Sequence, residues 1–279
     1  MSGTKQKTWF ITGTSTGLGR QLAERLLAQG QRVAATSRKT DGLSELQKEY
    51  GDRLWVRPLD VTDTAAIRQV MGEAFRDLGR VDVIVSNAGY GLFGAAEELT
   101  DGQIVQQIDT NLIGSLQVIR AALPHLRAQG GGRILQVSSE GGQIAYPNFS
   151  LYHATKWGIE GFVEAVAQEV APFSIELTLV EPGPTRTNFV GGMVSAPALA
   201  VYENTPSDEM RRSLTAGTSS WKFGDAAKTV QAMIDSVAVS PAPHRLTLGG
   251  GSYERLTQAF TDRRAALEAQ KDIAYSVDE

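Results

Sequence analysis

The stretch from residue 9 to residue 19 reads WFITGTSTGLG and joins a short apolar run to a glycine-rich turn. The apolar run is typical of a buried β-strand. Leucines recur at helical spacing after the turn, and Gly30 is placed to end the helix that they predict. A glycine-rich turn between a strand and a helix presents backbone N–H groups and a helix N-terminus to an anion.

Three glycines have different predicted roles in this turn. Gly13 permits the tight bend, Gly17 lets the backbone approach a pyrophosphate, and Gly19 lets the helix pack close to the strand. A tight strand-to-helix connection with no ligand is the alternative interpretation. We expect the cofactor-binding turn to comprise Gly13, Ser15, Thr16, Gly17, Leu18 and Gly19.

Strands and helices alternate along most of the chain. Such alternation implies right-handed crossovers and a parallel sheet, and the apolar strands fit a sheet covered on both faces. We therefore predict one α/β domain over residues 1–279, a doubly wound parallel sheet of the Rossmann type with about seven strands, whose cofactor half spans about 1–150. The predicted strands are 9–11, 32–36, 54–59, 81–86, 134–137, 175–180 and 245–248, and the main later helices are 65–78, 101–128, 152–170, 225–239 and 252–269.

The segment 185–222 differs from the rest because it is rich in small residues and Pro and has weak periodicity. Long connections inside compact domains are usually functional lids or mobile loops, so we predict a substrate lid here. We expect the last ~10 residues to fray.

Composition excludes several classes of protein. The net charge of −4 does not favour nucleic-acid binding. The absence of cysteine excludes a disulfide framework and a thiolate metal site, and the three histidines show no metal-ligand spacing, so we expect no metal. The N-terminus has no apolar signal region, and no apolar stretch reaches the ~18 residues that span a bilayer. We expect a cytoplasmic protein without a membrane partner.

Tyr152 and Lys156 stand at i and i+4 and would share one face of a helix. A free tyrosine has a pKa of ~10, and a nearby ammonium favours the phenolate. We therefore expect Lys156 to lower the pKa of Tyr152 toward the range useful for acid–base catalysis. Ser139 ends the fifth predicted strand, and ligands bind at the carboxyl ends of such strands. Ser138 is adjacent, but its spacing to Tyr152 is one residue too long.

The spacing Gly-x-x-x-Gly-x-Gly, followed by Ser139, Tyr152 and Lys156, resembles the short-chain dehydrogenase/reductase family in its Tyr-dependent branch. The resemblance covers about residues 8–190. It implies an oxidoreductase that converts a ketone or aldehyde to an alcohol, or the reverse, by hydride transfer from a nicotinamide cofactor. Ser139 and Tyr152 would bind the carbonyl oxygen, Tyr152 would supply the proton, and Lys156 would also bind the nicotinamide ribose. Asn111 matches the family's helix Asn, which holds a water linked to the Lys.

The same resemblance implies further cofactor contacts. Asp60 and Val61 would lie at the adenine, and a Pro-Gly stretch after the sixth strand would hold the nicotinamide amide. The family's Asn-Asn-Ala-Gly is here Ser86-Asn87-Ala88-Gly89, a mild departure. The residues concerned are Asp60, Val61, Asn87, Ala88, Gly89, Pro182, Gly183, Thr185 and Thr187.

The end of the second strand predicts which cofactor is preferred. An acidic residue there accepts a hydrogen bond from the ribose 2′-OH, whereas an Arg accommodates a 2′-phosphate. This chain has the neutral Ser37 followed by Arg38. We therefore expect NADP(H) to be preferred; if Arg38 is only a solvated charge, NAD(H) would serve nearly as well.

The same residues bear on two alternative functions. A non-catalytic NADP(H)-binding sensor or scaffold would be expected to lack Ser139, Tyr152 or Lys156, and an enoyl reductase would space Tyr and Lys differently. We leave open a homo-oligomer, either a dimer or a tetramer.

The substrate is predicted to be a small carbonyl compound or alcohol in a moderately apolar pocket. Phe189, Met193, Tyr202 and Met210 of the lid indicate this character. Glu140 is a candidate for binding a polar or cationic group, or for accepting a hydrogen bond from Gln143 or a backbone amide. His153, next to Tyr152, is expected to point elsewhere on the helix.

Overall fold

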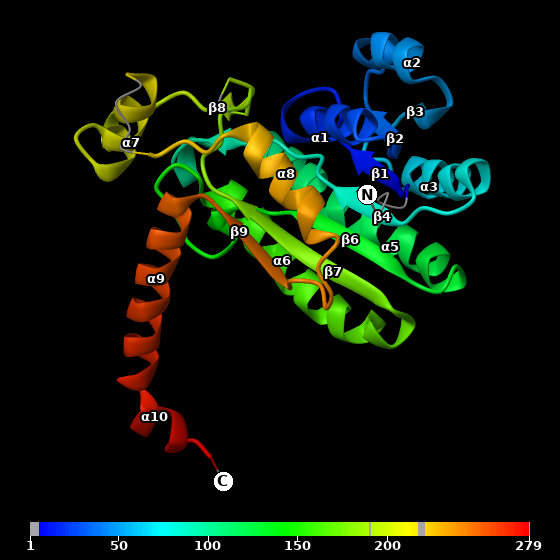
Figure 1. Cartoon of the computed structure of the whole chain (residues 1–279). Helices are drawn as coiled ribbons and strands as arrows, with labels where there is room; N and C mark the ends of the chain where they lie inside the picture. The colour runs from blue at the N-terminus through cyan, green and yellow to red at the C-terminus, as the bar shows by residue number, and fades with distance from the viewer. Residues whose placement is uncertain (1–5, 190, 217–220, 279) are drawn as a thin grey trace.

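The computed structural model describes residues 6–189, 191–216 and 221–278. Its centre is a seven-stranded sheet in the order β3-β2-β1-β4-β6-β7-β9, and every strand pair in it is parallel (Figure 1). The doubly wound, Rossmann-type sheet predicted from the sequence is confirmed. The strands are β1 (Thr8–Thr12), β2 (Arg32–Ser37), β3 (Leu54–Pro58), β4 (Val83–Ser86), β6 (Gly132–Val137), β7 (Ile175–Pro182) and β9 (Arg245–Leu248).

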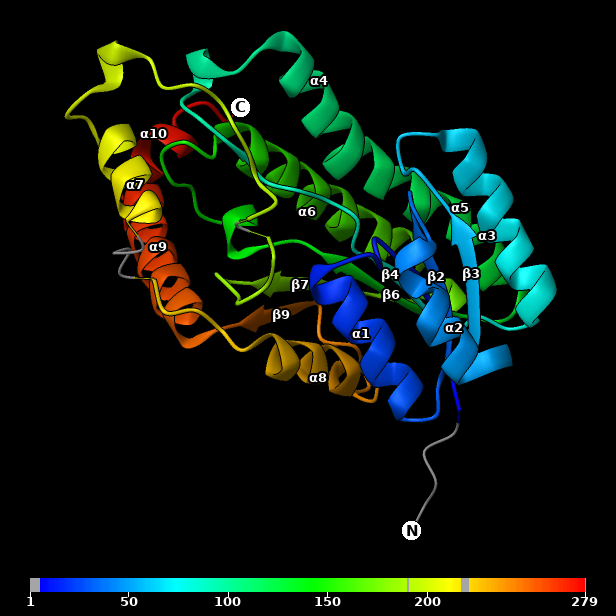
Figure 2. The same ribbon diagram turned by 90° about the horizontal axis from the view of Figure 1, so that it is seen from above.

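Helices cover both faces of the sheet because successive strand residues point to opposite sides. Phe10 packs in one core with residues of α3, α5 and α6, whereas Trp9 and Ile11 pack in the other with residues of α1 and α8. Figure 2 shows α1 and α8 together on one face. The helices are α1 (Gly17–Ala28), α2 (Ser44–Tyr50), α3 (Thr64–Leu78), α4 (Asp101–Ile108), α5 (Gly114–Ala128), α6 (Ser150–Val170), α7 (Pro206–Thr215), α8 (Ala226–Ser236), α9 (Gly250–Glu268) and α10 (Lys271–Tyr275).

The strand order reverses at β1, which pairs with β2 on one side and β4 on the other. At such a switch point the connections leave the carboxyl edge in opposite directions and open a crevice for a ligand. The β1–α1 turn and the residues after β4 meet at this point: Asn87 Nδ2 donates to the carbonyls of Thr12 (2.9 Å) and Gly13 (3.2 Å).

The predicted helix over 101–128 is interrupted, so that prediction is wrong in its middle. A π-helical turn, Asp109–Ile113, separates α4 from α5. It contains the buried Asn111, whose Nδ2 donates to the Tyr90 carbonyl at 2.8 Å and whose Oδ1 accepts from the Tyr90 N–H at 3.1 Å. The extra residue of a π turn rotates this side chain toward the β4 end of the sheet.

The predicted lid contains regular structure in its described part. β8 (Val194–Ser195) pairs with the short strand β5 (Leu92–Phe93), and α7 follows. The buried carboxylate of Glu98 anchors this segment because it accepts from the Leu199 N–H at 2.9 Å and forms an ion pair with Arg211 at 2.5 Å. Residues 190 and 217–220 of the predicted lid lie outside the described residues.

The C-terminal part runs away from the sheet as α9, with α10 at its end (Figure 1). The last ten residues, for which the sequence predicts fraying, contain the short helix α10, whose residues are exposed. Across the part of the chain that the structure describes, no helix is both long enough and apolar enough to span a bilayer.

The packing of Gly19 makes a first prediction. A Cβ on Gly19 would overlap Asn87 Nδ2 and the Gly13 carbonyl, whereas a Cβ on Gly72, inside α3, would meet nothing within 4 Å. We expect Gly19→Ala to destabilise the protein by about 1–3 kcal/mol through overpacking. Gly72→Ala, the matched control, should stabilise it by about 0.5–1 kcal/mol because alanine favours helix. Thermal and denaturant unfolding measure both changes; equal stabilities for the two variants would contradict this packing.

Candidate active site

A cavity of about 750 Å³ opens at the carboxyl edge of the sheet and brings the predicted site residues together. It is lined by Ser139, Tyr152 and Lys156 and by nearly all the predicted cofactor residues. Gly19 and Asn111 do not line the cavity, but each packs against a residue that does, Gly19 against Asn87 and Asn111 against Tyr90. The predicted cofactor residues that line it are Gly13, Ser15, Thr16, Gly17, Leu18, Ser37, Arg38, Asp60, Val61, Asn87, Ala88, Gly89, Pro182, Gly183, Thr185 and Thr187.

Two elements place the predicted reaction centre. Ser139 follows β6, and its Oγ accepts from the Gly141 N–H at 3.1 Å, which holds the start of a 3₁₀ turn. Tyr152 and Lys156 are buried one turn apart on α6. The Lys156 Nζ donates to the Val137 carbonyl at 2.9 Å and lies 5.6 Å from the centre of the Tyr152 ring.

Burial dominates the acidity of Tyr152. It raises the pKa to about 12, a hydrogen bond with Ser139 lowers it in part, and the charge of Glu140 raises it further. The expectation that a neighbouring ammonium gives Tyr152 a lowered pKa is therefore wrong for this structure, because desolvation of the phenolate outweighs the favourable interactions. Tyr152 is a protonated phenol at neutral pH and is suited to donate a proton.

Lys156 is shifted in the opposite sense by the same burial. Desolvation lowers the pKa of its ammonium to about 8, and the negative charge of Glu160 raises it. A buried cation is costly unless a partner compensates it, which explains the lowered pKa. With a pKa of about 8, Lys156 is charged at neutral pH but lies close to its titration range.

Asn111 is positioned by the π turn rather than by a regular helix. The backbone N–H and carbonyl of Tyr90 bond to the oxygen and the nitrogen of its side-chain amide. A Cβ on Gly89 would lie 3.2 Å from the Asn111 Oδ1. The side chain therefore braces the backbone turn that follows β4. The role in a water chain implied by the family stays a prediction.

Ser37, Arg38 and Asp60 line the end of the cavity that the sequence predicts to bind the cofactor. Ser37 Oγ donates to the Lys39 carbonyl at 2.6 Å, and Asp60 Oδ1 accepts from the Thr62 N–H and hydroxyl at 2.9 and 2.8 Å. Arg38 is exposed at the cavity wall. Burial raises the pKa of Tyr90 and the positive charge of Arg38 lowers it, and both residues line the cavity.

The opposite end of the cavity is aromatic. Around Tyr152, the ring of Phe149 lies at 6.2 Å and that of Phe189 at 5.8 Å, and Trp221 lies 5.7 Å from Tyr146. Four residues of the predicted lid are expected to give the pocket its apolar character. Phe189 and Met193 line the cavity, while Tyr202 and Met210 do not. Sequence reasoning missed Tyr90, Tyr146, Phe149, Leu214 and Trp221; the aromatic residues between Ser139 and Tyr152 were the available signal.

Glu140 lies beside Ser139 and is already paired. Its buried carboxylate forms an ion pair with Arg255 of α9 at 2.6 Å and accepts from the Tyr146 hydroxyl at 3.0 Å. The suggested partner Gln143 instead donates to Glu181 at 2.7 Å, so that prediction is wrong.

His153 lines the cavity, although the sequence led us to expect it to point elsewhere. Its Nδ1 accepts from the Tyr146 N–H at 3.2 Å. Burial lowers the pKa of its imidazole to about 4, so the ring is neutral near pH 7. This neutral ring contributes to the wall beside Tyr152 without adding charge.

Comparisons with known proteins agree with this geometry. Residues 7–197 match the family described as short chain dehydrogenase. Oxidoreductase BOA17 from Botryotinia fuckeliana is 35% identical over 269 residues, which cover 96% of this chain and 98% of that protein.

Two solved structures are also similar. A short-chain dehydrogenase from Streptomyces avermitilis is 35% identical with a TM-score of 0.90, and the match covers 99% of this chain and 100% of that one. An alcohol dehydrogenase from Thermococcus sibiricus, complexed with 5-hydroxy-NADP, is 25% identical with a TM-score of 0.72 over 88% of this chain and 96% of that one. The chain therefore belongs to the short-chain dehydrogenase/reductase family and is an oxidoreductase enzyme.

Proposed function

We propose that this enzyme interconverts a ketone or aldehyde and the corresponding alcohol, with NADP(H) as the cofactor and Tyr152 as the acid–base group. The observation that carries the proposal is the shared cavity. Ser139, Tyr152 and Lys156 face the same space as the glycine turn, and Tyr152 is held in its protonated form.

The residues at the first turn fit a dinucleotide. Gly13 and Gly17 adopt positive φ angles of 73° and 62°, and a Cβ on Gly13 would lie 2.9 Å from Ala88 Cα. Thr16 precedes α1 without a side-chain cap, so the first N–H groups of the helix are left to other acceptors. Such a helix N-terminus at a cavity wall suits the negative charge of a pyrophosphate.

The side chains of this chain would handle the proton and the oxygen. Ser139 Oγ and the Tyr152 hydroxyl would donate hydrogen bonds to the carbonyl oxygen, where negative charge develops. The bound nicotinamide supplies the hydride in reduction and accepts it in oxidation. Tyr152 would give its proton to the developing alkoxide, and the Lys156 ammonium would stabilise the phenolate left behind. In oxidation the proton moves back.

The preference for NADP(H) rests on charge at the end of β2. Arg38 lines the cavity, and its neighbour Ser37 is neutral and engaged by its own chain. A guanidinium suits a 2′-phosphate, and no carboxylate occupies the Ser37 position to repel one. The NADP analogue bound to the Thermococcus sibiricus enzyme is consistent with this preference.

The aromatic end of the cavity supports a carbonyl compound with bulky apolar substituents. Phe149, Phe189 and Trp221 form its wall, with Met193 and Leu214 beside them. Burying an apolar group against such side chains contributes about 25 cal/mol per Å². Because Arg255 neutralises Glu140, the cavity offers little attraction to a cationic substrate. The described part of 185–222 covers this end and would act as the lid.

Turnover on a panel of ketones and aldehydes, followed by the absorbance of NADPH, tests the proposed function. We expect Tyr152→Phe to lose at least 10²-fold in kcat, the lower range for acid–base catalysis, while binding NADPH with nearly unchanged Kd. Tyr253→Phe is the matched control, because Tyr253 is 68% exposed on α9. Normal turnover by Tyr152→Phe would contradict the mechanism.

Arg38→Asp tests the cofactor preference. The substitution removes a charged hydrogen-bond donor and places a carboxylate where a 2′-OH could bind, so we expect KM for NADPH to rise about tenfold or more while KM for NADH falls. Lys39→Asp has the same charge change at the next residue, which does not line the cavity. An unchanged NADPH preference in Arg38→Asp, or an equal shift in both variants, would remove Arg38 from the cofactor site.

The pKa of Lys156 predicts a pH limit for carbonyl reduction. The ammonium is present below about pH 8 and is lost above it, whereas Tyr152 stays protonated to about pH 12. We expect kcat for reduction to fall as the pH rises through about 8. A pH–rate profile with a limb at about 10 or higher would show that Lys156 does not set the limit.

A further inference from the structure

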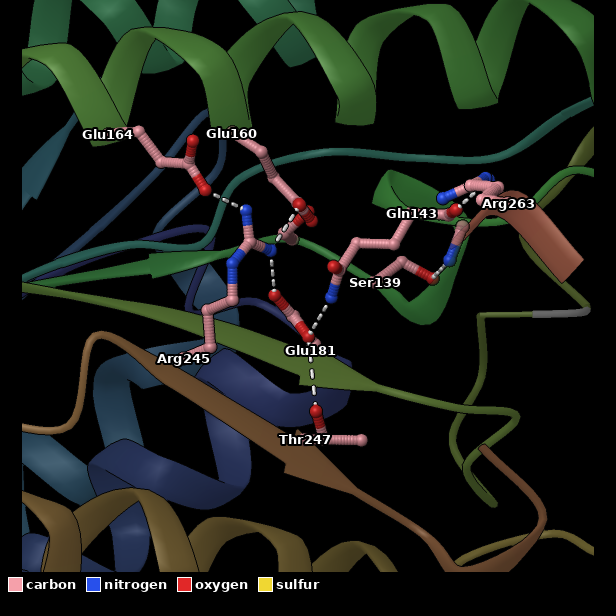
Figure 3. Close-up of polar contacts among 10 residues, drawn as sticks. Ser139, Gln143, Glu160, Glu164, Glu181, Arg245, Thr247 and Arg263 are labelled. Atoms are coloured by element: carbon pink, nitrogen blue, oxygen red, sulfur yellow. Dashed lines mark hydrogen bonds and ion pairs between the residues drawn. The ribbon is translucent and has the colours of Figure 1, made fainter. Parts of the chain in front are cut away.

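A partly buried cluster of charges, centred on Arg245 of β9, lies next to the loop that carries Ser139 (Figure 3). The Arg245 guanidinium forms ion pairs with Glu160 at 2.6 Å, with Glu181 and with Glu164. The side chains of Glu160 and Glu181 are 4% and 0% exposed, whereas that of Glu164 is 47% exposed. The single Arg245 cation therefore pairs with two buried carboxylates and with one partly exposed carboxylate.

The two buried carboxylates also hold the loop that carries Ser139. Ser138 Oγ donates to Glu160 Oε1 at 2.6 Å, and Gln143 Nε2 donates to Glu181 Oε2 at 2.7 Å. Both ends of the 138–143 loop are thus tied to carboxylates that Arg245 neutralises.

The loop also packs tightly against the Glu160 carboxylate at Gly142. A Cβ on this glycine would overlap the Glu160 side chain. Glu160 therefore contacts the loop through a hydrogen bond at Ser138 and through close packing at Gly142, whereas the Glu164 carboxylate pairs with Arg245.

Glu160 has a second neighbour at the reaction centre. It follows Lys156 by four residues on α6, so the two side chains share one face of the helix. Its negative charge raises the pKa of Lys156 and opposes the effect of burial.

The charged groups around Glu160 come from three elements. They are Lys156 and Glu164 on α6, Glu181 on β7 and Arg245 on β9. Burial raises the pKa of Glu160, and the hydrogen bonds from Arg245 and Ser138 lower it, because both donate to the ionised carboxylate.

We propose that Glu160 is a positioning residue of the active site, which holds the Ser139 turn through Ser138 and places a carboxylate beside Lys156. The proposal rests on the proposed function of Ser139 and Lys156. Glu160 acts through these two residues, which connect the Arg245 cluster to the cavity.

Glu164 provides a matched control within the same cluster. It lies one turn further along α6 and pairs with the same guanidinium. If the Arg245 cluster had only a structural role, Glu160→Gln and Glu164→Gln would differ only in stability. If Glu160 positions the site, only Glu160→Gln changes the pH dependence.

The experiment compares wild type, Glu160→Gln, Glu164→Gln and Ser138→Ala. We expect Glu160→Gln to lower kcat about tenfold, as for loss of a hydrogen bond to a charged group, and to move the alkaline limb of kcat to lower pH. Ser138→Ala keeps the carboxylate, so it should lower kcat by a similar factor with the limb unchanged. Glu164→Gln should match wild type in kcat and in the limb.

A direct titration of Lys156 keeps this test independent of turnover. NMR of ¹³Cε-labelled lysine, with the Lys156 signal assigned from Lys156→Arg, should show a lower pKa in Glu160→Gln and an unchanged one in Glu164→Gln. An unchanged Lys156 pKa in Glu160→Gln overturns the proposal. If Glu160→Gln does not fold, a kcat of Ser138→Ala equal to that of wild type overturns it. Failure of wild type to turn over any carbonyl compound, with the NMR shift present, contradicts the proposed function and not the placement of Glu160.

Discussion

The contact between the first turn and the end of β4 is the constraint on which the site depends. Asn87 donates to the carbonyls of Thr12 and Gly13, while Thr12 Oγ1 accepts from the N–H groups of Asn87 and Ala88. These bonds satisfy backbone groups that the diverging strand connections leave unpaired. Gly19 is required in the same place because any side chain there would overlap the turn. The packing of Gly19 and Asn87 against the Thr12–Gly13 turn thus fixes the position of the backbone that borders the crevice.

Burial has opposite effects on Tyr152 and Lys156, the two titratable groups of the proposed reaction centre. It raises the pKa of Tyr152 and lowers that of Lys156, so each group is moved toward its neutral form. Ser139 and Glu160 counteract these shifts, one at each residue. The consequence is a phenol that stays protonated and an ammonium that is present at neutral pH, which together suit proton delivery to a carbonyl oxygen. Glu160 can carry this negative charge in a buried position because its ion pair with Arg245 offsets the cost of burying the carboxylate.

Loop placement at this site depends on residues far away in the chain. Arg245 joins β9 to β7 and α6, and Arg255 of α9 reaches Glu140 next to Ser139. The C-terminal third contributes no reacting group to the proposed mechanism, yet Arg245 and Arg255 both hold the loop after β6, Arg245 through Glu160 and Glu181 and Arg255 through Glu140. Glu98 has a comparable effect on the predicted lid, because it pairs with Arg211 of α7 and accepts from the Leu199 N–H.

The sequence by itself determined the sheet and the first turn and predicted the set Ser139, Tyr152 and Lys156, which lines one cavity, because apolar runs, glycine spacing and strand ends are local signals. It did not reveal the π turn at Asn111, since Ile108, Leu112 and Leu116 continue the apolar i, i+4 spacing through the turn. Only the tertiary structure decided the pKa of Tyr152, the engagement of Glu140 by Arg255, and the pairing of Arg245 with Glu160 and Glu181. Those properties depend on burial and on contacts between residues far apart in the chain, 64 positions for Arg245 and Glu181, and no local spacing encodes them.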